Sequence, residues 1–450
     1  MNREAAIQTE PAVEDIALKR RFQPYPDYQD SSVEWLGRVP EHWLPARLAD
    51  HVCLINGYPF DSAQFSRDSG TPLIRIRDIL RRNTEVRWAG PHVAEAEVDD
   101  GDVLIGMDGA FNVGWWLGGK AVLNQRVCCL RAKARLNQRY LYYFISAPLR
   151  AINDVTYSTT VKHLSSFDVL KVRYALPPLD EQQAIAAFLD LETARIDELI
   201  AEKQRLVELL AEKRTALISH AVTKGLNPDA PMQDSSIHWL GQVPMHWERK
   251  RIKHLLHRIV DTEHKTAPFY PDGDFLVVRT TNVRNGRLVM AGAKFTDAEG
   301  YAEWTGRAVP RPGDILFTRE APAGEACLVP DDRLVCLGQR MVLFEIRRER
   351  LDGYFCLYSI YSGIADEFIK LLSQGSTVAH FNMSDIGNIP LLVPPIAEQR
   401  QIATYVHEQA ERLDGLMNTV ADAIGKLREY RSALISAAVT GKIDVRCEVN

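Results

Sequence analysis

Two sets of arginine residues occupy matching places in the two halves of the 450-residue chain and could contact nucleic acid. The first set is Arg75, Arg77, Arg81 and Arg82, and the second set is Arg279, Arg284 and Arg287. Within the second set lie three polar residues that could read base edges: Thr280, Thr281 and Asn282. Arginine suits this chemistry because its planar fork donates two parallel hydrogen bonds to a phosphate or a guanine. The alternative is a solvated loop face with salt bridges, and the recurrence in both halves strengthens the nucleic-acid interpretation without excluding that alternative.

A second paired element carries small hydroxyl residues and a histidine. STTVKHLSSFD (158–168) corresponds to GSTVAHFNMSD (375–385). Side chains of such a loop can donate hydrogen bonds to phosphates or base edges. Its candidate binding residues are Lys162, His163, Thr377 and His380. The alternative is a turn that caps the segment that follows it.

Three other features have a structural interpretation as their first explanation. The Gln-Arg pairs at 125–126 and 339–340 stand at the head of a predicted strand and could be hydrogen-bonding pairs of the fold. The glycine-rich stretch 106–120 lacks phosphate-binding spacing and is typical of a hairpin-like loop. The tryptophans of the two WLGxVPxHW stretches (35–43 and 239–247) are expected to be packing anchors, because tryptophan buries a large area.

Catalytic motifs are hard to find. The chain has no Gx4GK[ST] phosphate loop, no strand–GxGxxG–helix unit, no HExxH and no GxSxG. Residues 263–265 spell the E-x-K half of a metal-dependent nuclease site, but without a suitable acidic partner we interpret this match as a coincidence. The seven cysteines form no CxxC pair and are expected to be reduced and mostly buried. The sequence therefore predicts no catalytic, cofactor or metal residues in this chain.

The elements that carry these residues occur twice, because the chain is an internal repeat. From Asp30 and Asp234, 10 of 14 residues match without a gap. Residues 177–226 and 394–443 align at an offset of 217 with 19 identities in 50. The sequence therefore predicts two halves of one fold, joined by the linker 227–234.

Each of these 50-residue segments is expected to form one long helix. Pro-Pro cannot lie inside a helix, so each helix should begin directly after it, and no proline follows until the helix ends. Apolar residues then recur at steps of four and three, which predicts a heptad seam. In the first copy the predicted seam is Ile185, Leu189, Glu192, Ile196, Leu199, Lys203, Leu206, Leu210, Lys213 and Leu217. In the second copy it is Ile402, Val406, Gln409, Leu413, Leu416, Val420, Ala423, Leu427, Tyr430 and Leu434. If the two helices pair antiparallel, the halves become related by a pseudo-two-fold axis.

Charge is distributed unevenly between the helices and the β-rich segments. Segment 44–176 has 17 Lys/Arg against 13 Asp/Glu, segment 248–393 has 19 against 19, and the remainder has 18 against 27. The net charge of −5 argues against a uniformly basic coat but permits local basic faces. No apolar run has the length of a membrane span or a signal peptide, so we expect a cytoplasmic protein.

The order of these segments resembles the specificity subunit of type I restriction–modification systems. The match rests on SSVEWLGRVPEHW, the PPL-x-EQ-x-x-I helix start and the ALISxAVTxG helix end, each present twice between about Tyr25 and Ile443. The resemblance implies an α+β protein: two homologous mixed α/β target recognition domains, separated by two long conserved helices that form an antiparallel intramolecular coiled coil with pseudo-two-fold symmetry. The expected boundaries are a flexible tail (1–24), recognition domain 1 (25–176), a spacer helix (177–226), the linker (227–234), recognition domain 2 (235–393), a distal spacer helix (394–443) and a C-terminal tail (444–450).

The resemblance also implies a function and partners. Such a subunit is not catalytic: each recognition domain binds one half of a bipartite, asymmetric site in double-stranded DNA, and the helix pair sets the gap. Two methyltransferase subunits would dock on the helices, and restriction subunits would complete the complex. No cofactor is expected in this chain, whereas S-adenosylmethionine, ATP and Mg are expected on the partner subunits. The alternative function is a coiled-coil scaffold that never binds DNA.

Overall fold

The computed structural model describes residues 21–155, 162–235, 240–262, 265–320, 322–364, 367–368 and 382–448. The chain divides into two units. The first unit contains Met1–Glu202 and Ala423–Asn450, and the second unit contains Lys203–Asp422. Each unit therefore includes one β-rich part of the chain and a portion of each long helix.

Two long helices follow the two Pro-Pro pairs, as predicted. α6 spans Leu179–Lys224 with 46 residues, and α11 spans Ile396–Val439 with 44 residues. Carboxylates stand in the first turn of both helices, where they interact favourably with the unpaired N–H groups. No helix among the described residues is long and apolar enough to cross a membrane.

The buried stripe of α6 differs from the predicted seam beyond Ile196. The predicted seam residues Leu199 and Leu206 are 40% and 44% exposed, and Lys213 is also exposed. Ile200, one residue after Leu199, is 9% exposed, and Val207 is half-buried. The predicted register was wrong here because apolar residues occupy both 199–200 and 206–207, so steps of three and of four both fit a helical period.

The same displacement occurs in α11. The predicted seam residue Leu416 is 47% exposed, whereas the adjacent Met417 is half-buried. Ile402, Val406, Leu413 and Leu434 were placed correctly, because each is less than 10% exposed.

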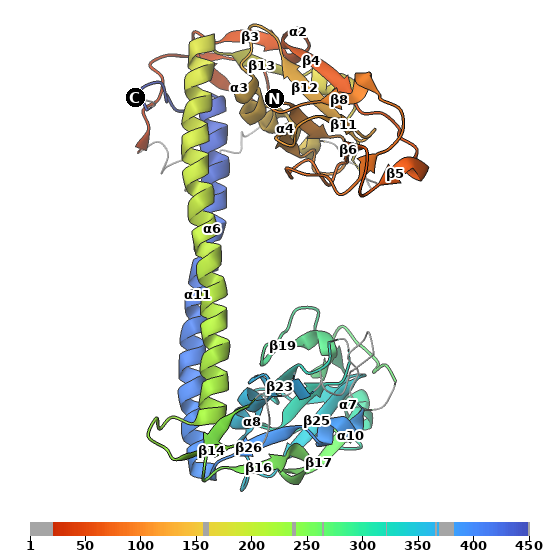
Figure 1. Ribbon diagram of the computed structural model, residues 1–450, viewed down its shortest axis with the longest axis vertical. Helices are drawn as coiled ribbons and strands as arrows, with labels where there is room; N and C mark the ends of the chain where they lie inside the picture. The colour runs from red at the N-terminus through yellow and green to blue at the C-terminus, as the bar shows by residue number, and fades with distance from the viewer. Residues whose placement is uncertain are drawn as a thin grey trace, which may run out of the picture. The chain divides into compact units, whose positions relative to one another are not determined.

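Each unit contains an ion pair between its portions of the two helices. In the first unit Arg431 of α11 donates from Nη2 to Asp197 Oδ2 of α6 at 3.0 Å. In the second unit Arg214 Nε of α6 lies 2.9 Å from Asp414 Oδ1 of α11. The portions of α6 and α11 within each unit therefore lie side by side (Figure 1).

The β-rich part of the first unit has two main sheets. One is antiparallel with strand order β10-β9-β12-β4, and the other has the order β5-β7-β6-β11-β8. The strands of the first sheet are β4 (Val52–Asn56), β9 (Val103–Gly106), β10 (Val113–Trp115) and β12 (Val127–Ala132). Those of the second are β5 (Phe65–Ser66), β6 (Thr71–Ile74), β7 (Arg87–Trp88), β8 (Glu97–Val98) and β11 (Ala121–Leu123). β9 and β10 confirm the hairpin expected from the glycine-rich stretch.

Two small strand pairs and four α-helices accompany these sheets in the described part of the first unit. The strand pairs are β1 (Tyr28–Asp30) with β2 (Arg38–Pro40), and β3 (Leu44–Arg47) with β13 (Arg173–Leu176). The helices are α2 (Leu48–His51), α3 (Gln138–Phe144), α4 (Ser146–Val155) and α5 (Ser166–Leu170). α3 lies against α6 (Figure 1), where Arg139 and Tyr143 both donate to Asp190 Oδ1 at 2.6 Å.

The second unit repeats this topology. Its four-stranded antiparallel sheet has the order β17-β25-β22-β23, and a smaller sheet has the order β21-β18-β24. The strands are β17 (Leu256–Asp261), β22 (Ile315–Thr318), β23 (Ala326–Leu328), β25 (Met341–Ile346), β18 (Phe275–Val278), β21 (Lys294–Thr296) and β24 (Val335–Leu337). The smaller pairs are β14 (Met232–Asp234) with β15 (Gln242–Pro244), β16 (Glu248–Arg251) with β26 (Pro390–Val393), and β19 (Val283–Arg284) with β20 (Arg287–Leu288).

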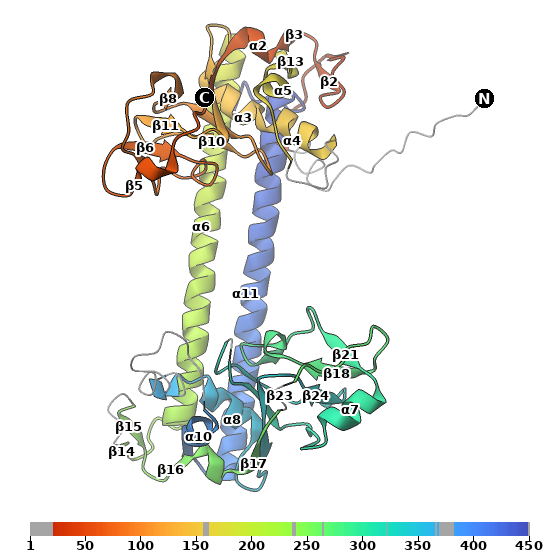
Figure 2. The ribbon, with the colours of Figure 1, turned by 90° about the vertical axis from the view of Figure 1, so that its right-hand side faces the viewer.

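The short α-helices in the described part of the second unit are α7 (Ala298–Trp304), α8 (Gly353–Ile360) and α10 (Met383–Gly387). Figure 2 shows α7 next to β21 and β24. The core of this unit joins α8 and the four-stranded sheet to the long helices: Phe317 and Phe344 are fully buried in one apolar cluster with Phe355 of α8 and Ile402 of α11.

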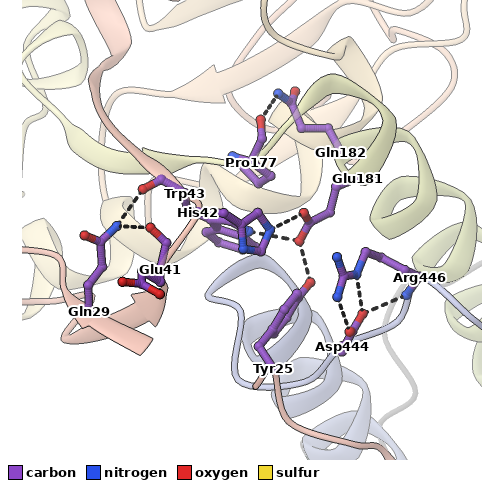
Figure 3. A network of polar contacts seen from close by, with 10 residues as sticks. All are labelled: Tyr25, Gln29, Glu41, His42, Trp43, Pro177, Glu181, Gln182, Asp444 and Arg446. Atoms are coloured by element: carbon purple, nitrogen blue, oxygen red, sulfur yellow. Dashed lines mark hydrogen bonds and ion pairs between the residues drawn. The ribbon is translucent and has the colours of Figure 1, made fainter. Parts of the chain in front are cut away.

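A carboxylate at the start of each long helix ties that helix to the WLGxVPxHW stretch, and Figure 3 shows the contacts of Glu181 at the start of α6. Glu181 is 3% exposed and accepts hydrogen bonds from Trp43 Nε1 at 2.9 Å and from Tyr25 OH at 2.6 Å, while His42 Nε2 lies 2.7 Å from it. Glu398 repeats the arrangement with Trp247 at 3.1 Å and His246 at 2.8 Å. Trp43 and Trp247 are thus buried packing anchors, as expected, and also donors. Trp35 is only half-buried and donates to Arg173 O at 3.3 Å, and Trp239 lies outside the described residues.

The glutamine that follows each of these glutamates is also part of the fold. Gln182 is fully buried, donates to Pro177 O at 2.8 Å and accepts from Asn137 N at 2.8 Å (its bond to Pro177 is drawn in Figure 3). Gln399 donates to Pro394 O and accepts from Asp352 N, both at 2.9 Å. The Glu-Gln pair of the repeated helix start therefore joins each helix to its β-rich part.

Parts of both expected tails are packed in the first unit. Phe22 is 2% exposed and Val445 is fully buried. Asp444 N donates to Gln23 O at 2.8 Å, which joins the two ends of the described chain. The expected tails 1–24 and 444–450 therefore include ordered segments, which the repeat pattern did not indicate because these segments complete one unit from opposite ends of the chain.

Candidate nucleic-acid interface

Each unit has one pair of parallel strands whose carboxyl ends bring two turns together. In the first unit β6 and β11 are parallel, and Asn124 N donates to Ile74 O at 3.0 Å. In the second unit β18 and β24 are parallel, and Gly338 N donates to Val278 O at 2.7 Å. The arginine set and the Gln-Arg pair of each half are adjacent for this reason.

The arginine sets begin on the same turn in both units. Arg75 N donates to Asp78 Oδ2 at 3.1 Å, and Arg279 N donates to Asn282 Oδ1 at 3.2 Å. Asp78 and Asn282 are both fully buried. Asn282 also donates from Nδ2 to Val289 O at 3.0 Å, so its amide is engaged in the turn.

The arginines of the first set differ in their exposure to solvent and in their ion pairs. Arg75 is 18% exposed and lies 3.1 Å from both Asp78 and Glu85, and Arg81 lies 2.6 Å from Glu85. Hydrogen bonds from Arg81 and Arg75 lower the pKa of Glu85 below its ordinary value. Arg77 and Arg82 are exposed, and no carboxylate in the described part of the chain pairs with them.

The second set is more heavily hydrogen-bonded. Arg279 donates to Gly292 O at 2.7 Å, and Arg284 donates to Thr280 O and Val283 O at 2.6 Å. Arg287 donates to Glu411 and Asp414 of α11 at 2.6 and 2.9 Å and is half-exposed.

The two threonines lie on the 3₁₀ turn Thr280–Asn282. Thr281 is exposed and Thr280 is half-buried.

The loop with Lys162 and His163 joins the interface of the first unit. Gly109 N donates to Lys162 O at 3.0 Å, Leu164 N donates to Met107 O at 2.7 Å, and His163 Nδ1 lies 2.7 Å from Asp108 Oδ1. Lys162 Nζ is directed to the carbonyl of Asn153. The other two candidates of this element, Thr377 and His380, lie outside the described residues, as does the E-x-K glutamate.

The Gln-Arg pairs complete the interface, and each of their arginines lies beside a carboxylate. Arg126 Nη1 is 3.4 Å from Asp108 Oδ1, and Arg340 Nε is 3.2 Å from Glu320 Oε2. Sequence reasoning treated these pairs as structural and did not single out either acid. The available signal was their position in the repeated Gly-Asp-Val/Ile-Leu stretch: each acid stands four residues after the leucine of that stretch, Leu104 or Leu316.

The arrangement presents hydrogen-bond donors at the surface. Arginine, histidine and threonine side chains lie at the ends of two strands, whereas no three His, Cys, Asp or Glu side chains in the described ranges come close enough to hold a metal ion. Such a surface can bind phosphates and base edges. The predicted DNA-binding residues stay predictions, because no ligand accompanies them.

Comparisons with known proteins agree on one family. The model of the type I restriction modification DNA specificity domain matches residues 40–209 and again 244–424. The chain is 26% identical over 426 residues to the type I restriction enzyme EcoBI specificity subunit of Escherichia coli, covering 92% of this chain and 89% of that protein. It is 23% identical over 429 residues to the MjaVIII specificity subunit of Methanocaldococcus jannaschii, covering 91% and 95%.

A solved structure shares the fold. It is described as the structural basis underlying complex assembly and conformational transition of the type I R-M system. Its chain is 17% identical to this one, with 89% of this chain and 98% of that chain covered and a TM-score of 0.65.

Proposed function

This chain belongs to the type I restriction modification DNA specificity family, and from that premise we propose that it is the DNA sequence-specificity subunit of a type I restriction–modification complex. Each β-rich part binds one half of a bipartite, asymmetric site in double-stranded DNA. The predicted recognition domains are 25–176 and 235–393, and the interfaces described above are their reading surfaces.

The observation that carries this proposal is that the same turn occurs in both units with different residues in it. Buried Asp78 and Asn282 hold the turns alike, while the residues between differ: Ile-Arg in one and Thr-Thr in the other. Two equivalent turns that carry different hydrogen-bond donors are suited to two DNA half-sites of different sequence. A site composed of two different half-sites is non-palindromic.

The two long helices act as the spacer, paired antiparallel as a coiled coil. Asp197 and Asp414 are equivalent in the 217-residue repeat, as are Arg214 and Arg431. The ion pairs Asp197–Arg431 and Arg214–Asp414 are therefore one contact made twice, with the roles of α6 and α11 exchanged. Such an exchange is what a pseudo-two-fold axis produces, and it supports the symmetric arrangement.

Methyltransferase subunits dock on the outer faces of the helices. α6 carries four leucines there with large exposed fractions: Leu191 is 47% exposed, Leu199 40%, Leu206 44% and Leu209 45%. Apolar side chains on one helix are suited to a partner helix. Restriction subunits complete the complex, and S-adenosylmethionine, ATP and Mg belong to the partner subunits, so this chain is not itself catalytic.

A salt-dependent gel shift tests the proposed function. The complex reconstituted with its methyltransferase subunits should retard duplex DNA, and its affinity should fall steeply between 50 and 200 mM salt, as phosphate contacts require. Absent or salt-insensitive binding across a library of duplexes would instead favour the alternative, a scaffold that does not bind DNA.

A further inference from the structure

One carboxylate in each unit lies beneath the basic side chains of the candidate interface. Asp108 is 23% exposed, whereas the side chains of Arg126 and His163 beside it are 53% and 54% exposed. Glu320 is 26% exposed, and Arg340 beside it is 49% exposed. In both units the acid is recessed and the cation is at the surface.

The backbone places each acid in the same way. Met107 N donates to Arg126 O, and Arg319 N donates to Arg340 O, both at 3.0 Å. The residue before each acid is therefore fixed to the arginine of the Gln-Arg pair. The same arrangement therefore recurs at equivalent positions of the two repeated units, although the acid is an aspartate in one and a glutamate in the other.

The acids contact more than one cation. Asp108 Oδ1 lies 2.7 Å from His163 Nδ1 and 3.4 Å from Arg126 Nη1. Glu320 lies 3.2 Å from Arg340 Nε and 3.5 Å from Arg319 Nη2. At Arg126 and Arg340 the contact with the acid engages one of the five donors of an exposed guanidinium, which leaves other donors for a ligand. Arg319 differs, because it is 11% exposed and also donates to Asp261 Oδ2 at 2.7 Å.

Arg340 is also held in an unusual backbone conformation. Its φ is 69°, in the left-handed region that residues other than glycine rarely adopt. Strain of this kind persists where surrounding contacts enforce it and is concentrated at functional sites.

We propose that Asp108 and Glu320 are positioning residues for DNA reading. Each holds the basic side chains above it in the orientation in which their free donors meet the bases of one half-site. A free arginine loses much rotational freedom on binding, and a carboxylate that fixes it beforehand removes that loss. This inference rests on the proposed function, because it assigns how the same interface achieves specificity.

The test compares variants of the chain in the complex reconstituted with its methyltransferase subunits. Asp108→Asn removes the charge and keeps the size, Asp108→Glu restores the charge, and Glu320→Gln makes the equivalent change in the second unit. Asp68→Asn is the matched control, because Asp68 is an exposed acid of the first unit whose carboxylate makes no ion pair within the described chain. The readouts are methylation mapping on a pool of duplexes and the thermal unfolding midpoint.

We expect Asp108→Asn to relax selectivity for one half-site about tenfold and to leave the other half-site unchanged. Glu320→Gln should relax only the other half-site. Asp108→Glu should keep most of the selectivity, and Asp68→Asn should behave as the wild type. Unfolding midpoints should stay equal, which separates positioning from a loss of structure.

Other outcomes overturn the inference. If Asp108→Asn and Asp68→Asn have the same half-site selectivity, Asp108 only neutralises the charge of the neighbouring basic side chains and does not position them. If either single variant relaxes both half-sites together, its effect is on the fold. A wild-type complex without half-site selectivity would overturn the proposed function as well, whereas a selective wild type with unaffected variants overturns the positioning role alone.

Discussion

At the scale of single residues, the fold depends on buried polar side chains that each satisfy backbone or indole donors. Glu181 accepts from Trp43 and Tyr25, and Asp78 and Asn282 close the same turn in the two units. A buried acceptor that loses its donors costs much more than an exposed one, because it cannot turn to water instead. The two glutamates of the repeat differ in burial, and this difference makes a comparison possible.

Replacing Glu181 by glutamine should destabilise the protein by about 1–3 kcal/mol, since one of its two accepting oxygens becomes an NH2 donor that faces either the Trp43 and Tyr25 donors or His42. Glu398→Gln should cost less, because Glu398 is 28% exposed and Tyr25 has no counterpart there among the described residues. Urea unfolding of both variants measures the difference. Equal costs would contradict the role assigned to burial.

Thiol reactivity should divide the seven cysteines into two groups. All seven are free, and only Cys53 and Cys447 are exposed. Burial raises the pKa of Cys128, Cys327, Cys336 and Cys356 to about 12, so these thiols stay protonated and unreactive at neutral pH. An aromatic disulfide reagent should titrate two thiols in the native protein and seven after denaturation. The variant Cys53→Ser, Cys447→Ser should show no rapid phase; a remaining one would mean that a buried cysteine is accessible.

At the scale of elements, the buried stripe of α6 and its exposed leucines have separate roles. Ile200 faces the interior of the first unit, and Leu199 faces outward although both are large and apolar. The outward leucines are the proposed docking surface for methyltransferase subunits.

Ile200→Ala should lower the free energy of unfolding by about 2 kcal/mol, because it removes buried methylene groups. Leu199→Ala should change it by less than about 0.5 kcal/mol, since alanine is also a good helix former and the site is exposed. Unfolding measurements on the isolated chain check both values. The same Leu199→Ala variant should weaken methyltransferase binding in a pull-down titration. If Leu199→Ala instead destabilised the chain more than Ile200→Ala, the seam predicted from the sequence would be correct.

At the scale of the whole molecule, the duplication lets one chain carry two reading surfaces on equivalent scaffolds. The two four-stranded sheets share one strand order, and the two helix starts share one Glu-Gln anchor. A surface loop can therefore change in one half without altering the other half.

Exchange of residues 44–176 for the corresponding segment of a relative should change one half of the recognised site and preserve the other half. The physical reason is that the exchanged segment contains neither Trp43 nor Glu181. The hydrogen bond between these two residues, which joins α6 to the first unit, is therefore preserved. Methylation mapping of DNA from cells that carry the hybrid gives the new site. A change in both halves would show that the two surfaces are not independent.

The sequence by itself determined the duplication, the two long helices and their starting points, because repeats and Pro-Pro breaks are local patterns. It also indicated the hairpin of the glycine-rich stretch and the buried tryptophans. Only the tertiary structure decided which of two adjacent apolar residues faces inward on α6, since Leu199 and Ile200 satisfy the same periodicity. It alone joined the Lys162–His163 loop to Asp108 and Arg126, because those contacts link residues 18 to 55 positions apart through the antiparallel pairing of β9 with β12 and an antiparallel bridge between Asp108 and His163, which no local pattern specifies.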